Sequence, residues 1–143
     1  MKAALRTSAI LWIIWGIVHV FAGVMTVSQN SAAAVAGIAD AVDPAELLDR
    51  EYHEAAGALI KQHGFNLGWI GLTTIVGGFY IWGGSAVAIF VSALVGGLAD
   101  VGYFVFIDLG GFNRFMPGTV MTIFSGAAIG LSFFAYFRRR DAA

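Results

Sequence analysis

Cysteine is absent from this sequence, and charged side chains are scarce. Without cysteine the chain has no disulfide, no thiolate metal ligand and no thiol nucleophile. Only 12% of the 143 residues are charged whereas 59% are hydrophobic, and the mean hydropathy is +0.80. So few charges would not keep the surface of a soluble domain hydrated. The formal net charge of −1 offers no basic face for phosphates, so we expect no nucleic-acid partner.

Long apolar segments take the place of the missing charges. A helix needs about 20 apolar residues to cross the hydrocarbon of a bilayer. Four segments meet this requirement, at residues 7–27, 65–82, 85–107 and 117–137. Gly83 and Gly84 alone separate the second from the third, which predicts a tight antiparallel hairpin, and Pro117 falls in the first turn of the fourth, where proline is tolerated. The predicted fold class is all-α, an integral membrane four-helix bundle that forms one domain over residues 1–143.

The N-terminal segment imitates a signal peptide. Lys2 and Arg6 precede the apolar stretch, and a run of small residues follows at 31–34. The stretch is nevertheless longer than the roughly 7–15 apolar residues of a signal peptide, and it contains two tryptophans and a histidine. We therefore expect a retained first helix.

The distribution of basic residues predicts the orientation. After four crossings, Lys2, Arg6 and residues 138–140 would lie on one side of the membrane, and only Arg50, Lys61 and Arg114 on the other. Because basic residues near helix ends favour the cytoplasmic side, both termini are expected in the cytoplasm. The expected location is the inner (cytoplasmic) membrane of a bacterial cell, as a multi-pass protein whose first partner is the lipid bilayer.

The long loop between the first two membrane segments shows a helix start. Asp43 can cap the helix, Pro44 suits its first position and Glu46 its third. The pattern predicts an amphipathic helix over about 44–63, with Gly64 as its C-terminal stop. Residues 28–42 show no comparable pattern. The loop helix would either lie on the outer membrane surface or close the outer end of the bundle as a lid, and both alternatives stay open.

Small residues recur at a spacing of four within the apolar segments. This spacing lets helices approach closely, within one chain or between copies of a homo-oligomer joined through small-residue helix faces. The three patterns are Gly64-x-x-x-Gly68, Ser92-x-x-x-Gly96 and Gly126-x-x-x-Gly130.

His19 and Asp100 lie deep inside apolar segments and are the candidate catalytic residues. An aspartate at the centre of a membrane helix costs about 2.5–3.5 kcal/mol, so such residues mark sites or pair with each other. At 1.5 Å per residue, both lie roughly 10–12 Å below the outer ends of their helices. Their common depth predicts a hydrogen bond between them.

Further polar residues converge on the same outer level, which predicts an outward-opening polar pocket. The candidate substrate-binding residues are Tyr103, Asn66, His53, Glu54 and His63. Three of them also have a structural interpretation: His63 suits a helix C-terminus, where the dipole favours it, and His53 and Glu54 suit the solvated face of the loop helix. An intramembrane histidine can equally serve as a hydrogen-bonding group between helices.

Three classes of function remain open. A membrane enzyme could use the His19–Asp100 pair to move a proton on a small lipid-soluble substrate, in an isomerisation, cyclisation or hydrolysis. A metal or haem could be bound by His19, His53, His63 and Asp100, although their spacing matches no metal motif. The third class is a non-catalytic accessory or lipid-binding subunit. The cofactor is undetermined.

One pattern in the first segment carries a family resemblance. Gly16-x-x-His19-x-x-x-Gly23, followed later by a short glycine-rich hairpin, resembles the small bacterial four-helix membrane proteins of the DoxX-like kind. The resemblance implies the layout of four membrane helices and assigns no catalytic residue.

Overall fold

Helices make up almost the whole of the computed structural model, which describes residues 1–140. The elements are α1 (Lys2–Ser28), α2 (Ser31–Ile38), α3 (Pro44–Leu48), α4 (Glu54–Trp82), α5 (Ala86–Tyr103) and α6 (Val120–Arg140), with π-helical turns η1 (Phe104–Asp108) and η2 (Phe115–Thr119). Four stretches are long and apolar enough to cross a membrane, namely Lys2–Ser28, Glu54–Trp82, Ala86–Asp108 and Phe115–Arg140. The all-helical class and the four long apolar helices are therefore confirmed.

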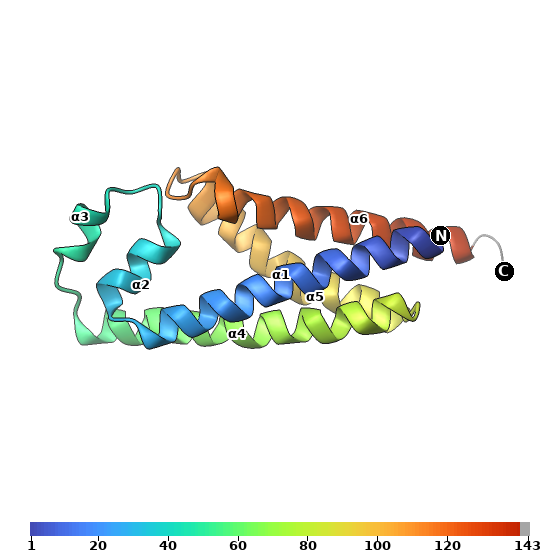
Figure 1. Cartoon of the computed structure of the whole chain (residues 1–143), viewed down its shortest axis with the longest axis horizontal. Helices are drawn as coiled ribbons and strands as arrows, with labels where there is room; N and C mark the ends of the chain where they lie inside the picture. Colours follow the sequence, from blue (N-terminus) through green and yellow to red (C-terminus); the bar gives the residue numbers. More distant parts are fainter. Residues whose placement is uncertain (141–143) are drawn as a thin grey trace.

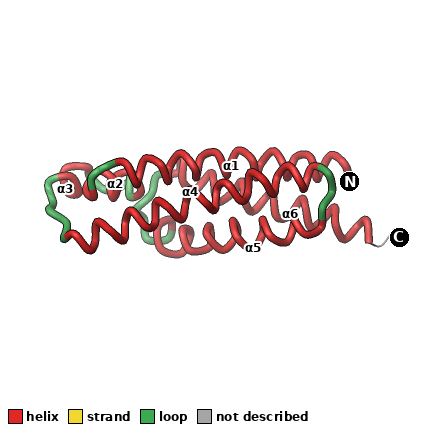
Figure 2. The backbone as a smooth tube through the Cα atoms, turned by 90° about the horizontal axis from the view of Figure 1, so that it is seen from below, coloured by secondary structure: helices red, strands yellow, loops and turns green. Residues whose placement is uncertain are grey.

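The four long helices run side by side. α1 packs along α4 on one side and α6 on the other, and α5 contacts both α4 and α6 (Figure 1). α1 and α5 therefore lie diagonally across the structure. Both chain ends lie at the same end, and the opposite end carries α2 and α3 (Figure 1). The loops are confined to the two ends (Figure 2).

α1 and α4 approach each other more closely than any side chain would allow. A Cβ atom added to Gly16 would lie 2.5 Å from the carbonyl oxygen of Gly71, and one added to Gly23 would lie 2.5 Å from that of Gly64. In lipid such close backbone contact replaces the hydrophobic drive for packing. The contact repeats every seven residues along both helices, through Ala9, Gly16 and Gly23 on α1 and Gly64, Gly71 and Gly78 on α4.

The predicted small-residue patterns of spacing four differ in whether they lie at a helix contact. Gly96 packs on the ring of Trp12, where an added Cβ would lie 2.5 Å from Cζ3, and Ser92 is fully buried against Gly77. Gly126 and Gly130, by contrast, are exposed, and nothing lies within 4 Å of an added Cβ at either. Among residues 1–140, that third pattern therefore mediates no helix contact.

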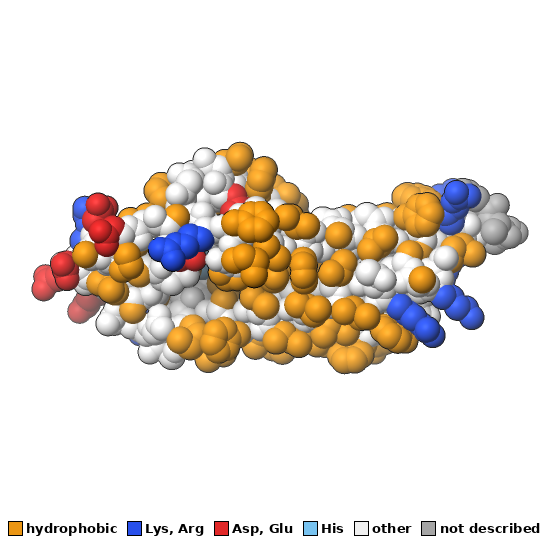
Figure 3. Space-filling model, turned by 45° about the horizontal axis from the view of Figure 1, so that its top comes forward, with side chains coloured by type: hydrophobic (Ala, Val, Ile, Leu, Met, Phe, Trp, Pro, Cys, Tyr) orange, Lys and Arg blue, Asp and Glu red, His pale blue; other side chains and the backbone are white. Residues whose placement is uncertain are grey.

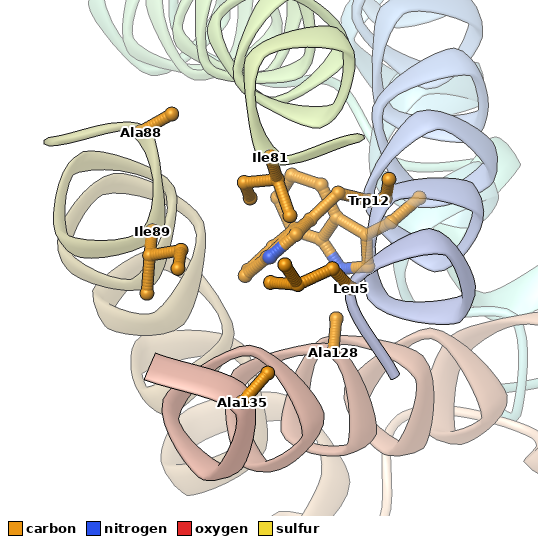
Figure 4. Close-up of a cluster of buried hydrophobic side chains, with 9 residues drawn as sticks. Leu5, Trp12, Ile81, Ala88, Ile89, Ala128 and Ala135 are labelled. Atoms are coloured by element: carbon orange, nitrogen blue, oxygen red, sulfur yellow. The ribbon is translucent and has the colours of Figure 1, made fainter. Parts of the chain in front are cut away.

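The interior is filled by two tryptophans of α1. Trp12 and Trp15 are both fully buried, and their rings meet edge to face at a centroid distance of 5.7 Å. Leu5, Ile81 and Ile89 pack around them, with small alanines from α6 on the far side (Figure 4). The long indole side chains reach across the diagonal between α1 and α5, which no short side chain could span.

The outer faces carry the large apolar side chains. On α1 the exposed residues include Ile10, Ile14, Ile17, Phe21 and Val24, and on α4 they include Phe65, Trp69, Leu72, Val76 and Phe79. Both sets follow one face of a helix. Hydrophobic atoms cover the middle of the molecule. The charged side chains at the end of the termini are Lys and Arg, whereas Asp and Glu, with some Lys and Arg, lie toward the end of α3 (Figure 3). The outer faces of these helices thus carry large apolar residues, whereas small residues line the contact between α1 and α4.

The predicted loop helix over 44–63 is wrong in its boundaries. α3 ends at Leu48 and buries none of its residues. α4 begins at Glu54 and continues through His63 and Gly64 into the second long helix. Gly64 does not end a helix because it lies mid-helix against Thr26 of α1, where an added Cβ would be 2.7 Å from the threonine Cβ. The glycine therefore serves close helix packing and not termination.

The short helix α2 was not predicted from the sequence. The tight hairpin between α4 and α5 was predicted and is present. Asn30 caps α2 by accepting a hydrogen bond from the Ala33 N–H at 2.9 Å. Ser85 caps α5 in the same way through Ala88. Gly84 has φ +88° in the connection, a conformation that glycine adopts without strain.

Candidate functional site

Trp15 holds Asp100 across the diagonal between α1 and α5. Its indole Nε1–H donates a hydrogen bond of 2.9 Å to Oδ2 of Asp100. The carboxyl group is only 5% exposed. A buried carboxylate needs donors, and indole nitrogen is a donor only, so the pair is chemically matched.

The same tryptophan also fixes His19. The imidazole stacks on the indole with ring centroids 3.5 Å apart and an interplanar angle of 17°. His19 Nδ1 lies 2.8 Å from the main-chain oxygen of Trp15. A carbonyl oxygen can only accept, so Nδ1 carries the proton and Nε2 of the neutral ring is a hydrogen-bond acceptor.

His19 and Asp100 therefore meet at Trp15 rather than at each other. No hydrogen bond joins them among residues 1–140, and the expected direct pair is replaced by two separate bonds to Trp15. The physical reason is that a neutral imidazole has a single N–H. In His19 that N–H donates to the main-chain oxygen of Trp15, so no donor remains for the carboxylate of Asp100. Asp100 is consequently bonded to Trp15, which lies one helical turn further from the α2–α3 end than His19.

A cavity of about 130 Å³ lies beside this group. His19, Asp100 and Tyr103 line it, together with His63 near the outer part of α4. The rest of its wall is largely apolar, including Val18, Ala22, Leu67 and Met121. A cavity of about 150 Å³ holds a benzene ring, so this one accepts a molecule of roughly that size or smaller.

The chain around residues 37–41 covers the cavity. Gly37, Ile38 and Asp40 contribute to its wall. Asp40 Oδ1 accepts a 2.7 Å hydrogen bond from the Arg114 N–H, and Ala41 donates its N–H to the carbonyl oxygen of Phe112 at 3.1 Å. The end of α2 and residues 39–41 thus close this end of the cavity against the α5–α6 loop, whereas α3 contributes no residue to its wall.

Asp108 organises the other side of the cavity. Its Oδ1 accepts hydrogen bonds from Asn113 Nδ2 at 2.8 Å and Thr119 Oγ1 at 2.9 Å, and its Oδ2 accepts one from Thr122 Oγ1 at 3.3 Å. These bonds tie η1 to η2 and α6, and so position Asn113 and Gly118 in the cavity wall. The sequence indicates Thr119 and Thr122 as polar residues at the outer level of the fourth segment, but their hydrogen bonds to Asp108 were not predicted.

The remaining predicted binding residues lie apart from the cavity. His53 and Glu54 are exposed at the start of α4, where His53 Nδ1 accepts a hydrogen bond from the Ala55 N–H at 3.2 Å and so caps the helix. Asn66 accepts a 3.1 Å hydrogen bond from the Trp69 indole. None of these three residues lines the cavity, whereas His63 and Tyr103 do.

The four candidate metal ligands do not come together in one cluster. Within the described part of the chain, no three His, Asp or Glu side chains come close enough together to hold a metal ion. His53, one of the four candidate ligands, caps a helix outside the cavity.

Comparison with protein-family models, with curated proteins and with solved structures gives no match. The resemblance to DoxX-like proteins stays a prediction.

Proposed function

We propose that the chain is a multi-pass membrane protein, a bundle of four spanning helices with its termini in the cytoplasm. The apolar outer faces support the first part. Monomeric soluble proteins rarely expose contiguous apolar patches above a few hundred Å², whereas these helices present large apolar side chains along their outer faces. The basic side chains Lys2, Arg6 and 138–140 gather at the end of the termini, which supports the orientation.

In this proposal the cavity beside His19 binds a small lipid-soluble molecule that carries a hydroxyl or amine group. The observation that supports this proposal is the tautomer of His19. Because Nδ1 donates its hydrogen to the main-chain oxygen of Trp15, Nε2 is a hydrogen-bond acceptor, and His19 lines a cavity whose wall is otherwise largely apolar. Asp100, which Trp15 engages at Oδ2, also lines the cavity and adds a second acceptor group. Such a site selects ligands that donate hydrogen bonds.

The same arrangement suits acid–base chemistry. His19 would accept the proton of the bound group through Nε2, and stacking on Trp15 would hold the imidazole in place while it did so. Asp100 would stabilise the positive charge from the neighbouring position without receiving the proton. Binding comes first in this mechanism and can be tested without knowing the reaction.

The test compares two probes of nearly equal size in mild detergent. Phenol carries a donor, and fluorobenzene does not. We expect phenol to raise the unfolding midpoint of the wild-type protein and fluorobenzene to raise it less. A His19→Phe variant keeps a ring that can stack on Trp15 but lacks the acceptor nitrogen, so phenol should lose its advantage.

His53→Phe provides the matched control, because it removes a histidine that does not line the cavity. It should keep the preference for phenol. Equal responses to both probes in the wild-type protein would refute the donor-selective site. Mass spectrometry of molecules extracted from the wild type and from His19→Phe would then identify the natural ligand as the species that only the wild type retains.

A further inference from the structure

A second groove lies at the end of the termini, away from the His19 cavity. It has a volume of about 350 Å³ and is formed by the start of α1, the α4–α5 hairpin and the end of α6. Leu5 and Ile89 are its buried apolar residues. Tyr136, Arg139 and Arg140 line its polar side.

Two arginines line the groove, and no carboxylate among residues 1–140 contributes to its wall. Every described Asp and Glu lies between Asp40 and Asp108 in the sequence, and the acidic residues of the α3 region lie at the opposite end of the molecule (Figure 3). Within residues 1–140, Arg139 donates one hydrogen bond, a long one of 3.4 Å to the carbonyl oxygen of Gly84, and no carboxylate pairs with either Arg139 or Arg140. As far as residues 1–140 are concerned, the two arginines thus line the groove with most of their guanidinium donors unpaired.

The neighbouring arginines are arranged differently. Arg6 lies over the ring of Trp82 at 5.2 Å, and Arg138 lies over the ring of Phe134 at 5.6 Å. Neither lines the groove. Gly84 makes room for Arg139, because an added Cβ would lie 2.5 Å from its Nη1. The chain therefore separates two arginines held on aromatic rings from two that line a groove.

We propose that this groove binds the phosphate group of an anionic phospholipid. The planar guanidinium fork matches the geometry of phosphate oxygens, and two such groups at one groove favour an anion over a zwitterion. The apolar floor at Leu5 and Ile89 suits the lipid portion next to the phosphate, and basic pockets between membrane helices are known lipid headgroup sites. The inference rests on the proposed membrane location and is independent of the His19 cavity.

The experiment uses the purified full chain in a neutral detergent, where no charged membrane surface contributes. Phosphatidylglycerol, phosphatidylcholine and inorganic phosphate are titrated separately, and bound lipid is counted by native mass spectrometry. We expect one phosphatidylglycerol to bind with preference over phosphatidylcholine. Arg139→Gln and Arg140→Gln should each weaken it about fivefold, the contribution of one basic residue near a lipid surface.

Arg138→Gln is the matched control, since it removes the same charge at a position outside the groove. It should weaken binding less than twofold, and His19→Phe should leave it unchanged, which separates this site from the proposed function. Arg140→Gln also guards against a folding defect, because Arg139 alone contacts the Gly84 carbonyl. Equal weakening by all three arginine variants would overturn the site in favour of diffuse charge. Equal binding of phosphatidylcholine, or displacement of the lipid by millimolar inorganic phosphate, would overturn the phospholipid as occupant.

Discussion

Replacing Trp15 by phenylalanine tests the central contact of the candidate site. The change removes the indole N–H that donates to Asp100 Oδ2 at 2.9 Å and keeps an aromatic ring beside His19. A hydrogen bond to a charged group contributes about 1.5–3 kcal/mol, and the smaller ring adds a small cavity term at a fully buried position. We expect Trp15→Phe to lower the free energy of unfolding by about 2–4 kcal/mol.

Thermal or denaturant unfolding in mild detergent provides the measurement, with Trp69→Phe as control. Trp69 is 44% exposed, and its indole donates to a surface asparagine. Its replacement should cost no more than about 0.5 kcal/mol, as for most surface changes. Similar losses for the two variants would contradict the assigned role of Trp15.

A double-mutant cycle separates the hydrogen bond from the packing. Once Asp100 is replaced by leucine, no buried carboxylate is left without a donor, so Trp15→Phe should cost much less in that background. We expect a coupling energy of at least about 1.5 kcal/mol between the two positions. Strictly additive effects would mean that the Trp15–Asp100 bond does not form in the folded protein.

Three further outcomes follow from the packing and the proposed orientation. Gly16→Ala should destabilise by about 1–3 kcal/mol because its Cβ would meet the α4 backbone, whereas Gly126→Ala should change the unfolding midpoint little; equal shifts would contradict the close α1–α4 contact. Ser92→Ala should be neutral or slightly stabilising because its buried hydroxyl has no partner within residues 1–140, whereas Ser8→Ala should cost about 1 kcal/mol by losing its 2.8 Å bond to a carbonyl of α6. A reporter enzyme fused after Ala143 should be active only in the cytoplasm, and external activity would refute the proposed orientation.

The four long helices could be predicted from the sequence because hydropathy and length alone define them. The hairpin at Gly83–Gly84 followed from the absence of any longer connection. The α1–α4 contact could also have been predicted from the sequence, but from small residues spaced by seven and not by four. Glycines recur every seven residues on α4, and the matching positions of α1 are Ala9, Gly16 and Gly23, whereas the pattern of spacing four also includes the exposed pair Gly126 and Gly130.

The sequence predicted a common level for His19 and Asp100 but did not predict their hydrogen-bond partners. Counting residues from the helix ends placed His19 and Asp100 near one level, and both line the same cavity. Counting gives no information on which helices are neighbours, and α1 and α5 turn out to be diagonal. Only a long side chain spans that distance, so Trp15 takes the role that was predicted for His19. The cover formed by residues 37–41 could not be predicted, because it depends on backbone contacts with the distant Arg114 and Phe112.

The inward face of α1 explains why the cavity exists and how it can be closed. Residues 12, 15, 19 and 22 follow one helix face, and their side chains shrink from tryptophan through histidine to alanine toward the α2–α3 end. At the level of Trp12 and Trp15 the indoles fill the diagonal space between α1 and α5. At the level of His19 and Ala22 the smaller side chains leave this space open. Ala22→Leu should therefore fill part of the 130 Å³ and abolish the response to phenol while leaving His19 and Trp15 in place. Because the added side chain is buried, the free energy of unfolding without ligand should stay the same or rise by up to about 2 kcal/mol. A variant that still responds to phenol as strongly as the wild type would show that the molecule binds elsewhere.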